Sequence, residues 1–189
     1  AGISRVVFGS SDETVARGGA NALRAAGVEV VSSQRQIECD DIVAPWRHFN
    51  DTGLPYVTLK MASTLDGYVA ANDGSSRWIT GEEARTFVHQ LRARVDAVAV
   101  GSGTVAIDDP LLDVRLPGEW PQPLRFVIGK RELKSDLRIT GLATQLRTHD
   151  PLEALQEMAR HGVMHVLLEG GPTTAAAFIR AGLVNEIFW

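Results

Sequence analysis

The chain has 189 residues, of which 44% are hydrophobic and 22% are charged, a composition typical of a globular protein that buries a core. Its formal net charge of −4 provides no basic field for nucleic acid or an anionic membrane surface, and no apolar run approaches the ~20 residues that span a bilayer. The single cysteine, Cys39, excludes an internal disulfide and a zinc site made of several thiolates, so we expect a soluble, cytoplasmic protein.

The first fifty residues predict a βαβ unit. Segments 5–9 and 28–31 are short β-branched runs, and the helix-forming segment 16–27 between them ends at Gly27. Segment 32–53 mixes polar and apolar residues around Pro45, which predicts a short helix followed by a linker. We therefore expect a domain boundary near residue 50.

The rest of the chain alternates helices with apolar strands. The sequence predicts strands over 55–64, 97–101, 124–129, 163–171 and 184–189, and helices over 81–95, 151–162 and 173–182. Asp150 is the expected N-cap of the second of these helices. The alternation favours an α/β domain with a largely parallel sheet, in which ligands bind beyond the carboxyl ends of the strands.

Three of these strand ends carry unusual residues. Lys60 lies within an apolar strand, which suits a cleft or a charge partner, but an edge strand that reaches water explains it as well. The segment 101–104, Gly-Ser-Gly-Thr, suits either a phosphate-binding backbone or a tight turn. The segment 169–172, Glu-Gly-Gly-Pro, suits either a ligand site or a capped helix start.

Cationic and aromatic side chains add two further candidates. Arg92 and Arg115 suit bidentate phosphate binding, although arginines paired with surface carboxylates are commoner. Trp78 suits stacking on a planar ring or packing in the core. The five histidines have no metal-ligand spacing, so we expect no metal site.

Segments 57–115, 123–133 and 167–187 together resemble the reductase domain of the bifunctional deaminase/reductase of bacterial riboflavin biosynthesis, the RibD family. The resemblance runs from about residue 54 to the end of the sequence. It implies a dihydrofolate-reductase-like α/β domain over 51–189 that uses NADPH and occurs as a homodimer. The implied reaction reduces the ribosyl side chain of the phosphoribosyl pyrimidine 5-amino-6-(5-phosphoribosylamino)uracil to the ribityl form.

Residues 1–50 resemble the closing βαβ part of the family's cytidine-deaminase-like domain. The zinc motif of such deaminases, His-x-Glu with Pro-Cys-x-x-Cys, does not occur in the sequence. We therefore expect zinc only in a missing part of a longer parent protein, and no deaminase activity from this chain. The family pattern also continues with further strands, so we expect the domain over 51–189 to be incomplete at its C-terminal end.

The resemblance implies roles for individual residues. The expected cofactor contacts are Ala62, Trp78, Thr104, Asp108, Gly171, Pro172, Thr173 and Thr174. The expected substrate contacts, which include two arginines for the ribose phosphate, are Ser76, Arg92, Leu112, Arg115 and Glu169. As a mechanistic hypothesis, the ribosylamine opens to an imine or an aldehyde equivalent and hydride reaches C1′. Lys60 is then the first candidate for the proton, with Glu169 orienting the sugar and Asp66 assisting.

The sequence departs from the family pattern after the strand at 124–129. Gly129-Lys130 stands where the family often has Asp-Ser, and Arg131 follows, so the two cations are expected to meet the 2′-phosphate of NADPH. Two alternative functions stay open. One is another NADPH-dependent reductase of the same fold, for example one acting on a pterin. The other is a phosphoribosyl- or nucleotide-binding module without turnover.

Overall fold

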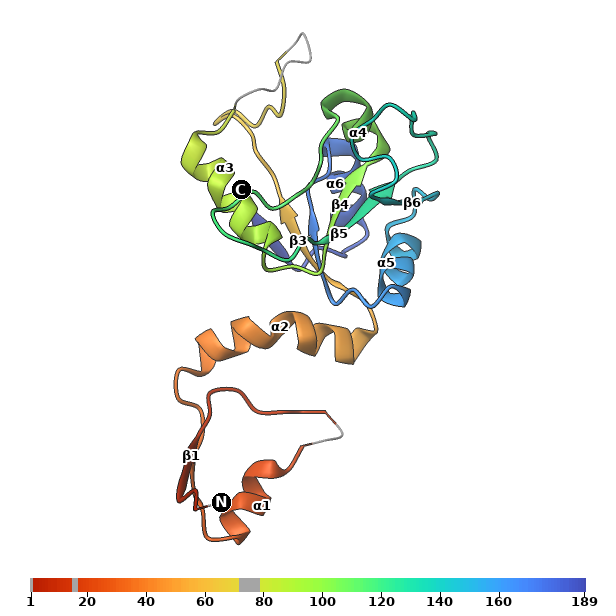
Figure 1. The fold of residues 1–189 in the computed structure, drawn as a ribbon. Helices are drawn as coiled ribbons and strands as arrows, with labels where there is room; N and C mark the ends of the chain where they lie inside the picture. The colour runs from red at the N-terminus through yellow and green to blue at the C-terminus, as the bar shows by residue number, and fades with distance from the viewer. Residues whose placement is uncertain (1, 15–16, 72–78) are drawn as a thin grey trace. The chain divides into compact units, whose positions relative to one another are not determined.

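The computed structural model describes residues 2–14, 17–71 and 79–189, which form two compact units, Ala1–Thr52 and Gly53–Trp189 (Figure 1). The first unit contains β1 (Arg5–Val7), α1 (Gly19–Ala25), β2 (Glu29–Val31) and α2 (Gln36–Thr52). The two strands pair in parallel, with Arg5 opposite Glu29, as the predicted βαβ unit requires. No described residue of this unit is buried.

The predicted linker is wrong, because α2 continues as one 17-residue helix through Pro45. Proline removes its own N–H from the helical hydrogen bonds, yet the turns on both sides remain helical. Near the end of α2, the side chains of Asn50 and Thr52 donate to the carbonyl oxygens of Trp46 and His48, at 2.8 and 2.7 Å. One proline is therefore a weaker stop signal than the sequence analysis assumed.

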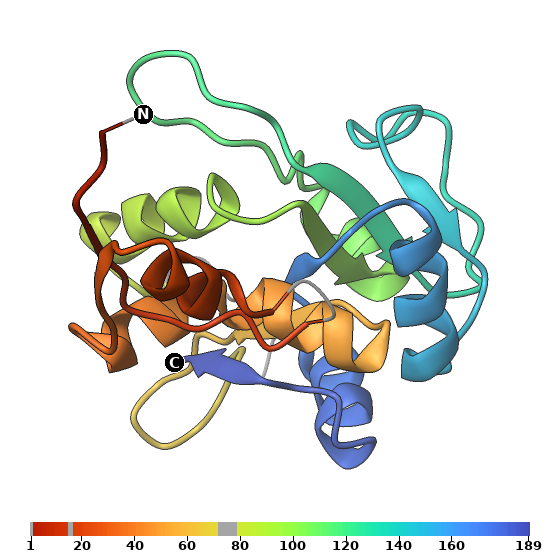
Figure 2. The same ribbon diagram turned by 90° about the horizontal axis from the view of Figure 1, so that it is seen from below.

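The second unit is built on a six-stranded sheet in the order β6-β5-β4-β7-β3-β8, and every pairing is parallel. Its strands are β3 (Tyr56–Lys60), β4 (Ala97–Gly101), β5 (Leu124–Ile128), β6 (Thr144–Leu146), β7 (His165–Leu168) and β8 (Glu186–Phe188). Figure 2 shows β4 and β5 side by side. The expected α/β domain with a parallel sheet is confirmed, although the short strand β6 was not predicted.

Among the described residues, the helices that pack on this sheet are α3 (Glu82–Arg92), α4 (Ser102–Asp108), α5 (Pro151–Arg160) and α6 (Pro172–Arg180). The N-cap of α5 is confirmed, since the Asp150 carboxylate accepts from the backbone N–H groups of Leu152 and Glu153. One buried cluster joins one face of the sheet to α5 and α6. A second cluster joins the opposite face to α3 and α4, so the sheet is buried on both faces.

The strand order contains a switch point between the neighbouring strands β4 and β7. The chain leaves β4 through α4 toward β5, whereas it leaves β7 through α6 toward β8 on the other side. In open parallel sheets, ligands bind in the crevice beyond the strand ends where such connections diverge. The residues that follow Val100 and Leu168 are therefore the first place to look for a site.

Candidate functional site

The helix α4, which follows β4 directly, touches the segment that joins β7 to α6 at the switch point. The backbone N–H of Gly171 donates to Thr104 Oγ1 at 3.1 Å, and the N–H of Glu169 donates to Ala99 O at 2.9 Å. A Cβ atom on Gly101 would lie 2.4 Å from Thr174 Oγ1, so the end of β4 packs closely against the first turn of α6. Three residues expected to contact the cofactor, Thr104, Gly171 and Thr174, therefore lie together.

The turn after β5 joins the same cluster through Gly129. This glycine has a φ of +136°, and a Cβ atom there would lie 2.3 Å from Ser102 Oγ. Both the backbone conformation and the packing exclude a larger residue at this position. Glycine at position 129 thus has a local structural reason, and the following Lys130 is exposed.

The turn after β7 leads directly into α6. Gly171 is the N-cap and makes no side-chain cap hydrogen bond, while Pro172 occupies the first turn. The predicted helix start is confirmed, but it is not capped by a side chain. Thr173 is exposed and Thr174 is half-buried beside Gly101. Uncapped amides and adjacent hydroxyls are the donors that a phosphate-bearing cofactor requires, so the residues present fit such a group.

Glu169, at the end of β7, is held by Arg92, the last residue of α3. Arg92 Nε donates to Glu169 Oε1 at 2.6 Å and Nη2 donates to Oε2 at 2.8 Å, and both side chains are 11% exposed. Arg92 Nη1 also donates to Asp113 O at 2.9 Å. Burial alone would lower the pKa of Arg92, but the hydrogen bond and negative charge of Glu169 raise it above its ordinary value. Arg92 therefore remains charged and fixes the carboxylate of Glu169.

Arg115, the second arginine expected to bind phosphate, lies against His89. Its backbone N–H donates to His89 Nδ1 at 3.2 Å, and its Nη2 atom lies 3.4 Å from His89 Nε2. Arg115 Nε lies 3.5 Å from Asp113 Oδ1, and its side chain is 62% exposed. Burial, together with the charges of Arg92 and Arg115, lowers the pKa of His89. Arg115 therefore offers much of its guanidinium to solvent, unlike Arg92.

His89 and Asp113 were missed by the sequence analysis. One signal was available for His89, because it precedes Arg92 by three residues on the predicted helix and such residues share a face. Asp113 offered none, since its role depends on an irregular segment folding back over α3.

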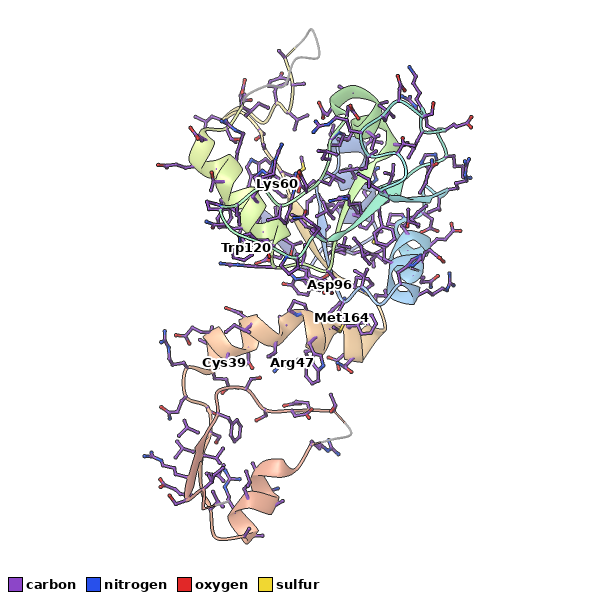
Figure 3. The ribbon with its side chains drawn as sticks, viewed as in Figure 1. Cys39, Arg47, Lys60, Asp96, Trp120 and Met164 are labelled. Atoms are coloured by element: carbon purple, nitrogen blue, oxygen red, sulfur yellow. The ribbon has the colours of Figure 1, made fainter. Side chains whose placement is uncertain are left out.

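Lys60 is the last residue of β3 and is labelled in Figure 3. β3 pairs with β7 in the register Leu59 opposite Leu168, so the next position along the two strands brings Lys60 beside Glu169. Lys60 is half-buried, and its side chain forms no hydrogen bond or ion pair within the described part of the chain. Ala62 follows β3 and is half-buried.

Asp66 lies in an exposed turn after β3. Its carboxylate accepts from Thr64 Oγ1 at 2.6 Å. Between the described residues there is no hydrogen bond or ion pair from Asp66 to Lys60 or Glu169. The structure therefore brings Lys60 and Glu169 to one sheet edge without joining Asp66 to them.

The other expected site residues differ in exposure. Leu112 is 2% exposed, has a φ of +55° and packs in the cluster beneath α3 and α4, so its side chain belongs to the core. Asp108, the last residue of α4, is half-buried. Ser76 and Trp78 lie outside the described residues.

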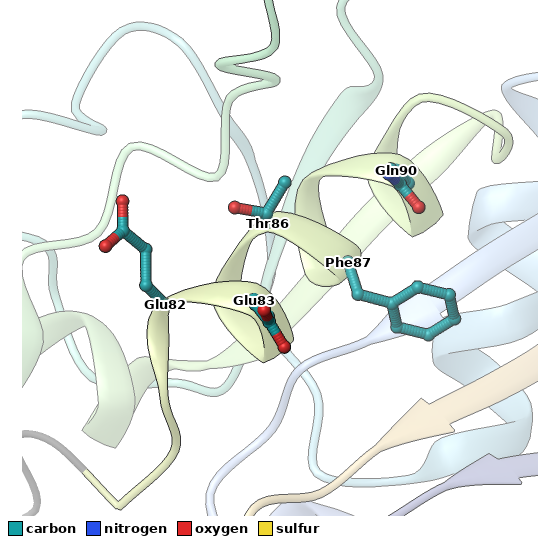
Figure 4. A pocket seen from close by; sticks show the side chains of 5 residues that line it. All are labelled: Glu82, Glu83, Thr86, Phe87 and Gln90. Carbon is teal, nitrogen blue, oxygen red and sulfur yellow. The ribbon is translucent and has the colours of Figure 1, made fainter.

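A hollow on the outer surface of α3 is lined by Glu82, Glu83, Thr86, Phe87 and Gln90 (Figure 4). The two carboxylates that line this hollow would repel an anionic ligand. None of the expected site residues that the structure describes lines the hollow. The described residues contain no group of three or more histidine, cysteine, aspartate or glutamate side chains arranged to hold a metal. Among the same residues, no helix is long and apolar enough to cross a bilayer.

Residues 55–189 match the family model of the RibD C-terminal domain. The riboflavin biosynthesis protein RibD of Mycobacterium tuberculosis is 43% identical over 196 residues, which cover 98% of this chain and 56% of that protein. The crystal structure of Acinetobacter baumannii RibD superposes with a TM-score of 0.83 at 30% identity, covering 97% of this chain and 59% of that one.

A third similar protein is the diaminohydroxyphosphoribosylaminopyrimidine deaminase/5-amino-6-(5-phosphoribosylamino)uracil reductase of Thermotoga maritima. Its structure has a TM-score of 0.82 at 28% identity and covers 95% of this chain. The chain thus spans little more than half the length of these relatives, 57% in the Thermotoga protein.

Proposed function

This chain belongs to the RibD C-terminal domain family, and from that membership we propose that it is an oxidoreductase of riboflavin biosynthesis. The proposed reaction is the NADPH-dependent reduction of 5-amino-6-(5-phosphoribosylamino)uracil to the ribitylamino form. The observation that carries the proposal is the meeting of two sets of residues at one switch point. Thr104, Gly171 and Thr174 suit a phosphate-bearing cofactor, while Glu169 beside them suits a sugar.

The proposed cofactor is NADPH. The uncapped start of α6, the hydroxyl of Thr104 and the exposed Lys130 would hold its phosphate groups, with Arg131 as a second cation for the 2′-phosphate. Ala62, Asp108 and Trp78 remain proposed contacts of the same cofactor. When bound, NADPH supplies the hydride that reduces the substrate.

In the proposed mechanism, the substrate's sugar is oriented by a carboxylate that cannot swing away. Both oxygens of Glu169 accept from Arg92, and each keeps a lone pair for a sugar hydroxyl. Lys60, at the adjacent register position, would supply or accept the proton at the opening ribosylamine. Asp66 is proposed to assist through the turn that follows β3.

Substrate affinity in this proposal comes mainly from the phosphate. Arg115, with much of its side chain exposed, would grip the 5′-phosphate, while Arg92 would contribute positive charge and its two unengaged N–H groups. Ser76 and the backbone of Leu112 remain proposed contacts. A pterin carries no sugar phosphate for these groups, which favours the phosphoribosyl pyrimidine over a pterin substrate.

We also propose a domain organisation for the chain and a second activity for its parent protein. Residues 51–189 would form a dihydrofolate-reductase-like domain, and residues 1–50 a remnant of a cytidine-deaminase-like domain without its zinc motif. The parent protein would be a cytoplasmic homodimer that also deaminates the preceding pyrimidine.

Cofactor oxidation distinguishes the candidate functions. The chain is mixed with the phosphoribosyl pyrimidine and NADPH, with the same substrate and NADH, or with a pterin and NADPH, and absorbance of the reduced nicotinamide is followed. The proposal predicts turnover in the first mixture and much slower turnover in the second. Turnover only with the pterin would favour the other reductase, and ribose 5-phosphate binding without any turnover would favour a binding module.

A further inference from the structure

His89 lies against the arginine proposed to grip the substrate's phosphate. On α3 it precedes Arg92 by one turn, and its ring faces segment 109–123, where it meets Arg115 and Asp113. The backbone N–H of Arg115 points at Nδ1, and the guanidinium Nη2 lies beside Nε2. No step of the proposed reaction uses this histidine.

The ring's protonation state decides which of these contacts are hydrogen bonds. A neutral imidazole has one N–H and one acceptor nitrogen. In the tautomer with Nδ1 as the acceptor, Nδ1 accepts a hydrogen bond from the backbone N–H of Arg115. In the other tautomer, Nε2 accepts a hydrogen bond from the Arg115 guanidinium and Nδ1 donates to Asp113 O. Either neutral tautomer thus accepts a hydrogen bond from Arg115, whereas a protonated ring accepts none.

We infer that neutral His89 is a positioning residue that orients Arg115 toward the substrate's phosphate. The inference rests on the proposed function, because it needs Arg115 to be the phosphate ligand. Two guanidinium groups face the ring, Arg92 from its own helix and Arg115 from segment 109–123. The opposing negative charge comes from Asp113 in that segment, while Glu169 at the end of β7 neutralises Arg92.

This arrangement makes substrate affinity depend on pH. Burial first, then the nearby arginines, keeps the pKa of His89 below its ordinary value, so the ring is neutral at pH 7. As the pH falls through that lowered pKa, the ring gains a proton, loses its acceptor and repels Arg115. The affinity for a phosphorylated ligand therefore falls in acid, beyond the loss caused by protonation of the phosphate itself, which titrates near pH 6.

The test compares His89→Leu, which removes both ring nitrogens, with His89→Asn, which keeps a short acceptor near Nδ1. His149→Gln is the matched control, because His149 is an exposed histidine outside this cluster. Two readouts are used: the Kd for ribose 5-phosphate by calorimetry without cofactor, and KM against kcat for the phosphoribosyl pyrimidine. We expect His89→Leu to raise both Kd and KM about tenfold while kcat changes less than about twofold. His89→Asn recovers part of the affinity, and His149→Gln matches the wild type.

Arg115→Ala, alone and combined with His89→Leu, shows whether His89→Leu weakens binding through Arg115 or through a general disturbance of the structure. If His89 acts through Arg115, its replacement has no further effect on Kd once Arg115 is gone. Equal losses in both backgrounds would overturn the inference, as would a wild-type Kd in His89→Leu.

If His89→Leu does not fold, His89→Asn replaces it in the test. Because asparagine does not titrate, we expect the affinity of His89→Asn to lack the acid-dependent loss that the wild type shows. If the wild-type chain neither turns over nor binds ribose 5-phosphate, the proposed function itself fails; turnover with unchanged affinities in the variants overturns only the role of His89.

Discussion

At the scale of single residues, the buried pair of Arg92 and Glu169 makes the strongest prediction. Replacing Arg92 with Ala leaves a carboxylate that is 11% exposed without its partner, and we expect the free energy of unfolding to fall by about 3 kcal/mol. The exposed pair of Arg160 and Glu157 is the control, for which Arg160→Ala should cost less than about 1 kcal/mol. Denaturant unfolding of both variants measures the two values.

The double variant, Arg92→Ala with Glu169→Ala, sharpens this prediction. Removing both charges together should cost less than the sum of the single losses, since no unpaired charge remains. Additive losses, or an Arg92→Ala variant as stable as Arg160→Ala, would show that the pair does not hold the turn after β7.

The sequence identified both members of this pair but not the pair itself. Glu169 and Arg92 were each predicted to contact substrate, and they are 77 positions apart in the chain. Their contact depends on which strand lies beside which, and residue spacing carries no information about strand order. The Asp150 cap, by contrast, was predictable because every atom involved lies within three residues.

Among the helices and strands, the packing of the end of β4 against α6 can be tested with one methyl group. Gly101→Ala places a Cβ atom 2.4 Å from Thr174 Oγ1, so the Thr174 side chain must move or α6 must shift, and we expect a loss of about 1–3 kcal/mol in the free energy of unfolding. Gly103→Ala is the control in the same segment, since a Cβ there meets nothing within 4 Å. It should be neutral or raise stability by about 0.5–1 kcal/mol, because alanine replaces glycine within α4.

Combining Gly101→Ala with Thr174→Ala removes the obstructing hydroxyl. We expect the double variant to recover most of the lost stability. If it is no more stable than Gly101→Ala alone, the contact between Gly101 of β4 and Thr174 of α6 is not the cause of the loss.

A second element-scale prediction concerns the edge strand β8. Thr58, 2% exposed in β3, donates to Glu186 of β8 at 2.9 Å, so His165 Nε2 at 2.8 Å must donate to the Thr58 hydroxyl. Burial lowers the pKa of His165, and the carboxylate of Asp96, near Met164 in Figure 3, only partly opposes this. The unfolded chain therefore binds a proton more readily than the folded one as the pH falls below about 6.5.

Well above pH 6.5, His165 is neutral in both states and does not affect stability, whereas acidification below about pH 6.5, toward its lowered folded-state pKa, lowers the free energy of unfolding. His165→Gln should lose part of this acid sensitivity between pH 7 and 5, and His149→Gln should retain it. Thermal unfolding at several pH values checks this; parallel pH curves for the wild type and His165→Gln would contradict it.

Helices and strands were predicted well where the hydrophobic pattern was strong, and poorly where the segment was short. The buried run of β4 and the amphipathic α3 both occur close to their expected positions. β6 was missed because its three residues, Thr-Gln-Leu, carry no alternating pattern and become a strand only by pairing with β5. The prediction of a linker was wrong because it treated Pro45 as the end of a helix, whereas the chain is helical on both sides of Pro45.

At the scale of the whole molecule, the parallel sheet turns separate motifs into one site. The segments around Lys60, Gly101, Gly129 and Glu169 lie far apart in sequence, yet all follow or end parallel strands and so meet at one edge. The sequence predicted that ligands bind beyond the carboxyl ends of the parallel strands. It did not predict that β7 inserts between β3 and β4, which is what brings Glu169 beside both Lys60 and the turn at Gly101.

The proposed hydride transfer to the sugar of the phosphoribosyl pyrimidine can be tested by isotope transfer. The chain is incubated with 5-amino-6-(5-phosphoribosylamino)uracil and NADPH deuterated at the transferring position, and the product is examined by mass spectrometry and NMR. We predict a ribitylamino product that carries one deuterium at C1′ of the former ribose. Oxidation of NADPH without deuterium at C1′, or no oxidation by a chain that is folded and binds NADPH, would contradict the claim.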